Sequence, residues 1–345
     1  MLEVRVGSTG GGGGPACYAS GTRLTVPEGA VAVEDLTVGT MVLTAGGEAQ
    51  PVRWIGHRSV NCSLSKNPSA VWPICIRAGA LVDGRPSRDL WVSPGHSILV
   101  GDVLIPAEKL VNGATIVQVR RERVQYWHVE LDRHDVLLAE DLPAESYLDT
   151  GNRSAFINGG DFIDSHPDFK PKHWAETCAP LVLEGEVLQR ARASLLSRAL
   201  ELGYERTVEA DAHIVADGMR IEPVSLPANR LAFLLPSQCS KIELRSRSFT
   251  PAHVDPASND TRSLGLCVGR LLLDGAEISL LEDAAFSHGW HAFERDCDSG
   301  WRWTQDRVPL AAGTRLLLID LARHGQYWSR PVSDTPHIDS VAAGA

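Results

Sequence analysis

The first half of the chain alternates apolar and polar residues in short stretches separated by turn residues. The clearest stretches are residues 22–26, 41–44, 51–55, 97–100, 103–105, 114–120, 124–131 and 136–139. Alternation of this kind, bounded by Gly, Pro or Asp, is typical of half-buried β-strands. We therefore expect residues 15–149 to form one all-β domain.

The pattern changes after residue 149. Residues 150–180 are rich in Gly, Pro and Asp, which indicates a linker. Apolar residues then recur at helical spacing and stop before Gly203, so we expect a helix over 181–204. The residues that recur at this spacing are Leu188, Leu195, Leu196 and Ala199.

Short strand-like stretches return after this helix, among them residues 213–216, 230–235, 241–246, 264–273, 278–281 and 314–319. They predict a second β-rich, sandwich-like domain over 205–330. Residues 1–14 are expected to be a flexible Gly-rich tail and residues 331–345 a loose tail. The predicted fold class is therefore mainly β, with one helix between two β-rich domains.

The composition argues against several classes of function. Among 345 residues, 43 are acidic and 33 basic, which gives a net charge of −10 and argues against general nucleic-acid binding. No apolar run approaches the roughly 18 residues of a membrane span. Seven cysteines occur without a C-x-x-C pair, so a zinc knuckle is not expected and the cysteines are read as free thiols.

The N-terminus lacks the basic segment and apolar core of a usual signal peptide. Free thiols and this missing signal favour the cytoplasm. Export by a non-classical route is the alternative, and the sequence leaves both open.

A group of nucleophilic and basic residues stands out in the first domain. Cys17 lies where the Gly-rich tail meets the first strand, a position that gives a thiol access. Ser93 and His96 lie in Ser-Pro-Gly-His, a sharp turn that brings the two side chains close together. His134 follows in Asp-Arg-His-Asp, whereas His128 alternates with Trp127 on an expected strand and is read as structural.

Four stretches in this order carry a family resemblance. They are ACYASGT at 16–22, VEDLTVGTMVLT at 33–44, SPGH at 93–96 and LDRHDVLLAE at 131–140. Over about residues 15–149 the chain resembles the Hint superfamily, the Hedgehog and intein autoprocessing domains, and in particular its bacterial Hedgehog-intein-like members. The resemblance implies an all-β horseshoe of two pseudo-symmetric halves.

The resemblance also implies a self-processing reaction. The Cys17 thiol would attack the Ala16 carbonyl in an N-to-S acyl shift and form a thioester, which water or an external nucleophile would resolve. His96 would protonate the Cys17 nitrogen, Ser93 would hydrogen-bond the scissile group, and His134 would assist acid-base work. The substrate would be the chain's own N-terminal segment, in a single turnover like that of a cysteine autoprotease, with no cofactor and no metal.

The sequence departs from splicing inteins at the end of this domain. Those inteins end in His-Asn followed by Cys, Ser or Thr, whereas residues 142–147 read Leu-Pro-Ala-Glu-Ser-Tyr. Asn152 lies nearby, but in the Gly-rich linker and before Arg153. We therefore expect N-terminal self-cleavage without full splicing. Neither the sterol-activating Asp nor an apolar sterol-recognition tail of Hedgehog domains is matched.

Two alternatives stay open. In one, the Hint unit is an inert scaffold and the C-terminal β module binds a ligand such as a glycan, with Trp301 and Trp303 as a stacking platform. In the other, the protein is a cysteine hydrolase that acts on separate peptides. At His288, His291 and Glu294 a plain loop is favoured over a metal site.

Overall fold

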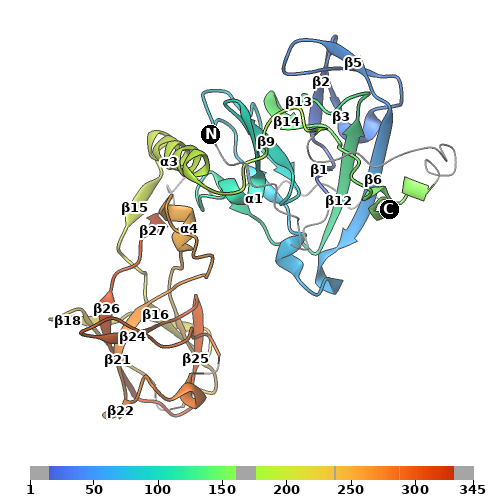
Figure 1. Cartoon of the computed structure of the whole chain (residues 1–345). Coiled ribbons are helices and arrows are strands. Elements are labelled where there is room, and N and C mark those ends of the chain that lie inside the picture. The colour runs from blue at the N-terminus through green and yellow to red at the C-terminus, as the bar shows by residue number, and fades with distance from the viewer. Residues whose placement is uncertain (1–14, 161–175, 237, 287, 330–345) are drawn as a thin grey trace. The chain divides into compact units, whose positions relative to one another are not determined.

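The computed structural model describes residues 15–160, 176–236, 238–286 and 288–329 (Figure 1). The chain divides into two compact units, Met1–Glu201 and Leu202–Ala345. The expected tails, 1–14 and 331–345, lie outside the described residues, as does the linker segment 161–175.

The first unit is built from short strands. They are β1 (Tyr18–Ala19), β2 (Arg23–Val26), β3 (Gly29–Ala32), β4 (Met41–Leu43), β5 (Ala49–Pro51), β6 (Trp54–Asn61), β7 (Ile74–Ile76), β8 (Leu90–Val92), β9 (Ser97–Val100), β10 (Val103–Pro106), β11 (Ile116–Gln118), β12 (Arg123–Glu130), β13 (Val136–Ala139) and β14 (Leu142–Glu145). Its helical elements are η1 (Val33–Asp35), η2 (Cys62–Leu64), η3 (Pro68–Ala70), α1 (Ala107–Leu110), η4 (Arg153–Ala155) and α3 (Glu186–Glu201).

Two six-stranded sheets form this unit. One has the order β11-β7-β8-β1-β12-β6 and the other β10-β9-β14-β13-β2-β3. Strand pairing is antiparallel in both, and the long pair β6 and β12 stays in register over their full length. The first sheet places β1, at the start of the domain, between β8 and β12, which come much later in the chain. This order positions the site described below.

The main core of the first unit lies between these sheets. It contains apolar residues such as Leu24, Ile76, Leu90, Ile98 and Leu137, each with no exposed surface. Gly56 on β6 permits a second, smaller cluster, because a Cβ there would lie 2.2 Å from the Trp54 ring and 2.7 Å from Phe156. A side chain at this position would therefore force both aromatic rings to move.

The helix α3 is shorter than the 181–204 expected. Leu181 pairs with Leu104 in an isolated β-bridge, and Gly185 takes a φ of 92°, so the helix begins only at Glu186. It ends before Gly203, whose φ of 87° is typical of a glycine that terminates a helix. Its buried side chains Leu188, Ala191 and Leu195 belong to the core of the first unit.

The second unit is again mostly strands. They are β15 (Glu205–Thr207), β16 (His213–Ala216), β17 (Met219–Ile221), β18 (Val224–Leu226), β19 (Arg230–Leu234), β20 (Ile242–Arg245), β21 (Cys267–Leu273), β22 (Ala276–Ile278), β23 (Glu294–Arg295), β24 (Gly300–Trp303), β25 (Arg307–Leu310), β26 (Leu316–Arg323) and β27 (Tyr327–Ser329), with the short helices α4 (Pro251–Val254) and η6 (Asp283–Ala285).

A seven-stranded and a four-stranded antiparallel sheet dominate the second unit. The larger has the order β18-β19-β26-β21-β24-β23 with β22 beside β21, and the smaller the order β17-β16-β20-β25. Phe233, Leu244, Val268, Val308 and Ile319 belong to one buried cluster that joins strands of both sheets. The second unit is thus β-rich, as the sequence predicted.

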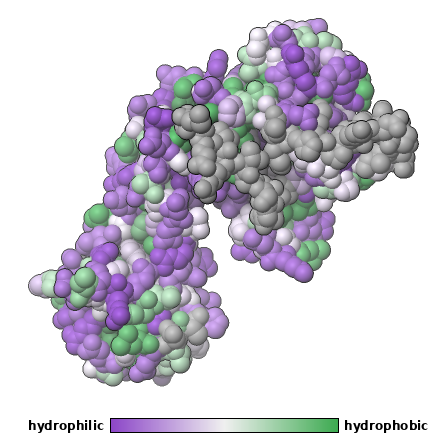
Figure 2. All heavy atoms as spheres, viewed as in Figure 1, coloured by the Kyte–Doolittle hydropathy of each residue, from purple (hydrophilic) through white to green (hydrophobic). Residues whose placement is uncertain are grey.

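The expected fold class is confirmed. Both units are mainly β, and the face shown in Figure 2 is largely hydrophilic, with apolar residues scattered among polar ones. Within the described residues, no helix is long and apolar enough to cross a membrane.

Candidate functional site

Cys17 lies immediately before β1 and has no exposed surface. Tyr18 pairs with Val92 of β8 on one side and with Trp127 of β12 on the other. The pairing with β8 brings Cys17 beside Ser93, the first residue after that strand. Cys17 and Ser93, 76 positions apart in the chain, thereby come within hydrogen-bond distance.

Ser93 holds the chain on both sides of the Ala16–Cys17 bond. The Cys17 amide, which contains the nitrogen of that bond, donates to Ser93 Oγ at 2.8 Å. The Ser93 hydroxyl donates in turn to the Pro15 carbonyl at 3.1 Å, and the Ser93 amide donates to the Cys17 carbonyl at 2.8 Å. Because Ser93 is 2% exposed, these contacts are shielded from water.

The Ser-Pro-Gly-His turn also brings His96 next to the Cys17 backbone. The His96 amide donates to the Ser93 carbonyl at 3.1 Å, which closes the turn between β8 and β9. The His96 ring is fully buried, with its centroid 4.2 Å from that of Tyr18. It faces the backbone of Cys17 and Glu145, although neither ring nitrogen makes a hydrogen bond of normal geometry within the described residues.

Burial controls the protonation of both groups. It raises the pKa of the Cys17 thiol to about 12, and the Arg58 guanidinium opposes this shift. It lowers the pKa of His96 to about 4, against a weaker opposite influence of the Glu145 carboxylate. At neutral pH the thiol therefore keeps its proton and the imidazole is neutral.

His134 lies one contact further from Cys17. Its Nδ1 accepts the Cys178 amide at 3.0 Å, and its Nε2 lies 3.6 Å from Glu145 Oε2. Burial by itself lowers the pKa of His134, but Cys178 and Glu145 together raise it to about 9. The described residues show no hydrogen bond between His134 and Cys17, so the two are connected only through Glu145 and His96.

Glu145 was not among the site residues predicted from the sequence. Its Oε1 accepts the Ser97 amide at 2.6 Å, and the carboxylate faces both His134 and His96. Burial by itself raises the pKa of Glu145, but His134, His96 and the Ser97 amide outweigh it and lower the pKa. A carboxylate at the end of the apolar strand β14 was the available signal, but it became meaningful only when its histidine neighbours were known.

His128 and Arg58 also lie closer to the site than expected. The His128 ring centroid is 5.0 Å from that of His96, and burial holds its pKa well below the usual range. Arg58 on β6 lies opposite Tyr126, and its charge acts on the Cys17 thiol. Neither residue stands in a recognisable motif.

In the second unit, the candidate metal ligands have other partners and the candidate sugar platform is buried. His291 Nε2 lies 2.7 Å from the Ser263 carbonyl, and Glu294 pairs with Arg262. Trp301 and Trp303 are 5% and 8% exposed, so they offer no open ring face for stacking. In the described parts of the chain, no cluster of three His, Cys, Asp or Glu side chains could hold a metal ion.

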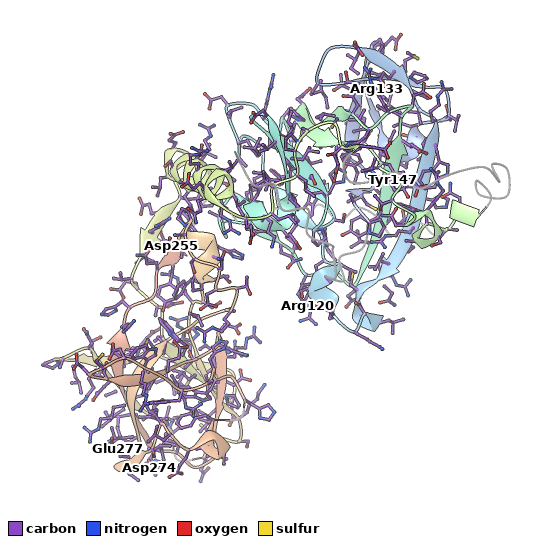
Figure 3. All side chains as sticks on the ribbon, in the orientation of Figure 1. Arg120, Arg133, Tyr147, Asp255, Asp274 and Glu277 are labelled. Carbon is purple, nitrogen blue, oxygen red and sulfur yellow. The ribbon has the colours of Figure 1, made fainter. Side chains whose placement is uncertain are left out.

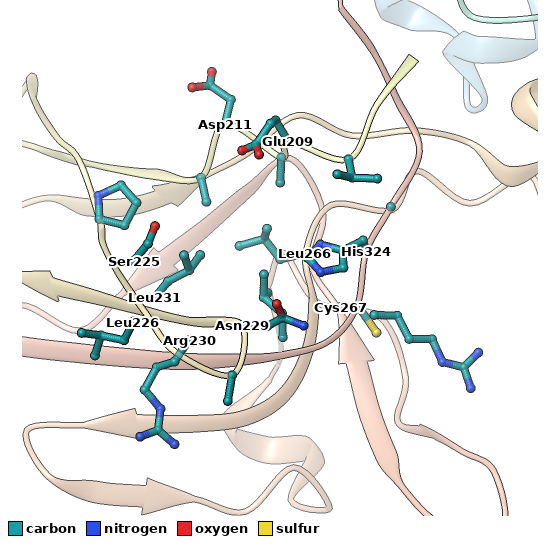
Figure 4. Close-up of a pocket in the computed structure, with 18 of the residues that line it drawn as sticks. Glu209, Asp211, Ser225, Leu226, Asn229, Arg230, Leu231, Leu266, Cys267 and His324 are labelled. Carbon is teal, nitrogen blue, oxygen red and sulfur yellow. The ribbon is translucent and has the colours of Figure 1, made fainter.

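The second unit does contain an open cavity of about 600 Å³ (Figure 4). Glu209, Asp211, Asn229 and His324 contribute polar groups to its wall. Leu231 and Leu266 are among its apolar lining. Its lining therefore mixes charged, polar and apolar side chains.

Comparison with known families decides the nature of the first unit. Residues 16–151 match the model of the Hint domain family. This segment forms a Hint domain. The matched range contains Cys17, Ser93, His96 and His134.

Several solved structures are similar to this Hint domain. A bacterial intein-like domain from Clostridium thermocellum is 14% identical, with 38% of this chain and 98% of that chain covered and a TM-score of 0.28. A DnaB intein from Synechocystis sp. PCC 6803 is 11% identical, with coverages of 38% and 99% and a TM-score of 0.27. The MchDnaB-1 intein is 14% identical, with coverages of 37% and 98% and a TM-score of 0.28.

No curated protein matched the chain. The Hint fold supports an autoprocessing or splicing-type domain over residues 16–151. The second unit is outside that match.

Proposed function

We propose that the Hint domain breaks its own Ala16–Cys17 peptide bond by an N-to-S acyl shift. The observation that carries the proposal is the hydrogen bond from the amide of that bond to Ser93 Oγ, next to the buried His96 ring. The nucleophile, a polar clamp and a proton-transfer group thus surround one peptide bond. This is the arrangement that amide cleavage by a cysteine requires.

The step balances as an internal rearrangement. Cys17 Sγ bonds to the Ala16 carbonyl carbon, the carbon–nitrogen bond breaks, and the Cys17 nitrogen takes up a proton. His96 is neutral at pH 7, because burial lowers its pKa to about 4. Its ring faces the Cys17 backbone, so it is placed to pass a proton to the leaving nitrogen. The proton that the thiol loses balances the proton that the nitrogen gains, so the step takes up no net proton from solvent.

The thioester is resolved by water or an external nucleophile such as an added thiol, which releases the segment before Cys17. C-terminal cleavage is not part of the proposal, because residues 142–147, the end that corresponds to the His-Asn of splicing inteins, contain no Asn. Asn152 is held by a hydrogen bond of 2.6 Å from the Tyr147 hydroxyl to its Oδ1.

Burial of Cys17 favours this internal reaction over hydrolysis of separate peptides. The thiol has no exposed surface, so a peptide from solution does not reach it, whereas the Ala16 carbonyl is adjacent in the chain. The remaining alternative is an inert Hint scaffold beside a ligand-binding second unit. The cavity lined by Glu209, Asn229 and His324 is the observation in its favour.

One experiment separates the two. The purified chain is incubated with dithiothreitol or hydroxylamine and followed by intact-mass measurement. We expect loss of the segment before Cys17 in the wild type, none in Cys17→Ala, and normal loss in Cys75→Ala, a buried thiol elsewhere in the unit. Cleavage that persists in Cys17→Ala, or a product that ends near Ser146, would refute the mechanism, and an intact wild type would favour the scaffold.

A further inference from the structure

A buried cluster surrounds the Cys17 thiol on one face of the first sheet. Ala19 on β1 lies opposite Tyr126 on β12, and Tyr126 lies opposite Arg58 on β6. Residues directly opposite in neighbouring strands share a face, as do residues two apart along a strand. Cys17 and Arg58 therefore project from the same face, with Tyr126 between their strands.

The side chains of the cluster itself are apolar or uncharged. The cluster that contains Cys17 and Tyr126 also includes Trp54, Cys62, Val124, Tyr147 and Phe156. Figure 3 shows Tyr147 in the interior of the first unit. Burial holds the pKa of Tyr126 and Tyr147 far above neutrality, so both stay uncharged. A charge in such surroundings is costly unless a partner compensates it.

Two arginines border this cluster, and they differ in their partners. Arg153 stacks over Trp54 at 4.2 Å and forms ion pairs with Asp149 and Glu130. Arg58 lies over the Tyr126 ring at 5.6 Å, and among the described residues no carboxylate pairs with it. Its Nε is buried without a hydrogen-bond partner. The positive charge of Arg58 is thus available to an anion that forms on this face.

The reaction creates such an anion at Cys17. When the thiol gives up its proton, a full negative charge develops on a buried sulfur. We infer that Arg58 stabilises the Cys17 thiolate across this face of the sheet. The role in the acyl shift rests on the proposed function, whereas the effect on the thiol itself does not.

The inference is tested through the reactivity of the thiol rather than through cleavage. Iodoacetamide is a small reagent that reaches a buried thiol through local opening of the fold and reacts with the thiolate to give a thioether and iodide. Its rate relative to that at a second buried thiol therefore reports the thiolate fraction, and the variant that keeps the charge separates this from a change in access. The intact chain is alkylated at pH 8 without added thiol, and peptide mass spectrometry gives the rates at Cys17 and Cys75. Cys75 is an internal reference, because it is also buried and burial also raises its pKa to about 12, while Arg58 is not among its neighbours.

Three variants make the test specific. Arg58→Met should lower the Cys17 to Cys75 rate ratio by about tenfold or more, the effect of losing one nearby opposite charge. Arg58→Lys should keep most of the ratio, because it keeps the charge. Arg120→Met is the matched control: Arg120 also lies over an aromatic ring, Trp72 at 5.9 Å, but is exposed at the edge of the unit (Figure 3).

The outcomes are distinguishable. An unchanged ratio in Arg58→Met, an equal loss in Arg58→Lys, or an equal loss in Arg120→Met would overturn the inference. Where the wild type cleaves with dithiothreitol, Arg58→Met should also slow cleavage by about tenfold or more, and Arg58→Lys should restore it. A wild type that never cleaves would refute the proposed acyl shift, and the alkylation ratio would still decide the role of Arg58.

Discussion

Ser93→Ala removes one hydroxyl that forms two hydrogen bonds around the scissile bond. The hydroxyl accepts from the Cys17 amide at 2.8 Å and donates to the Pro15 carbonyl at 3.1 Å, in a place that is 2% exposed. Each hydrogen bond contributes about 1 kcal/mol net, so about 2 kcal/mol of positioning is lost. If both contacts persist in the transition state, cleavage slows roughly 30-fold. The effect should be smaller than that of removing His96, because Ser93 supplies no proton.

The assay is single-turnover cleavage of the precursor with excess dithiothreitol, followed by intact mass. Hydrogen exchange of the Cys17 amide provides a second readout that does not depend on the chemistry. It should accelerate in Ser93→Ala, because the amide loses its acceptor. Ser93→Thr is the control, since it keeps the hydroxyl. A wild-type rate in Ser93→Ala, or an equal defect in Ser93→Thr, would show that the hydroxyl does not position the bond.

His96→Ala should slow cleavage about 100-fold or more, the effect of losing a positioned proton-transfer group, with Cys17 alkylation as a check that the site is still folded. Acid should destabilise the first unit: the folded-state pKa of His96 is about 4 against about 6.5 unfolded, so its contribution is full above pH 6.5 and lost between pH 6.5 and 4. That loss amounts to about 3 kcal/mol, and hydrogen exchange of the β6–β12 pair should show a smaller acid loss in His96→Gln than in the wild type. Arg153→Met should cost the first unit about 3–5 kcal/mol of unfolding free energy, because it removes the ion pairs that Arg153 forms with the buried Asp149 and Glu130. In denaturant unfolding, Arg133→Met, which breaks an exposed pair, should cost less than about 1 kcal/mol, and equal losses would contradict this reasoning.

Local sequence patterns predicted much of the fold. Alternation predicted strands at 97–100 and 103–105, and β9 and β10 pair there around Gly101, whose φ is 64°. The prediction works because side-chain alternation and positive-φ turns are properties of a few neighbouring residues. The start of α3 was missed for the opposite reason, since Leu181 is drawn into a bridge with Leu104 by a contact 77 positions away.

The residues of the candidate site were likewise predictable only in part. The motifs around Cys17, Ser93, His96 and His134 were visible in the sequence, because their residue types and order resemble one family. Their neighbours Glu145 and Arg58 were not, since nothing in a single strand reveals which charged residue another strand will face.

The sequence by itself therefore determined a mainly β chain with a Hint-like set of nucleophile, hydroxyl and histidines. The tertiary structure alone decided that β1 lies between β8 and β12, which brings the Cys17 amide to Ser93. It also decided that Cys17 and His96 are both fully buried, and hence that the thiol stays protonated and the imidazole neutral at pH 7. Pairing between distant strands and exclusion of water are properties of the whole packed domain, and a local pattern of residues does not encode them individually.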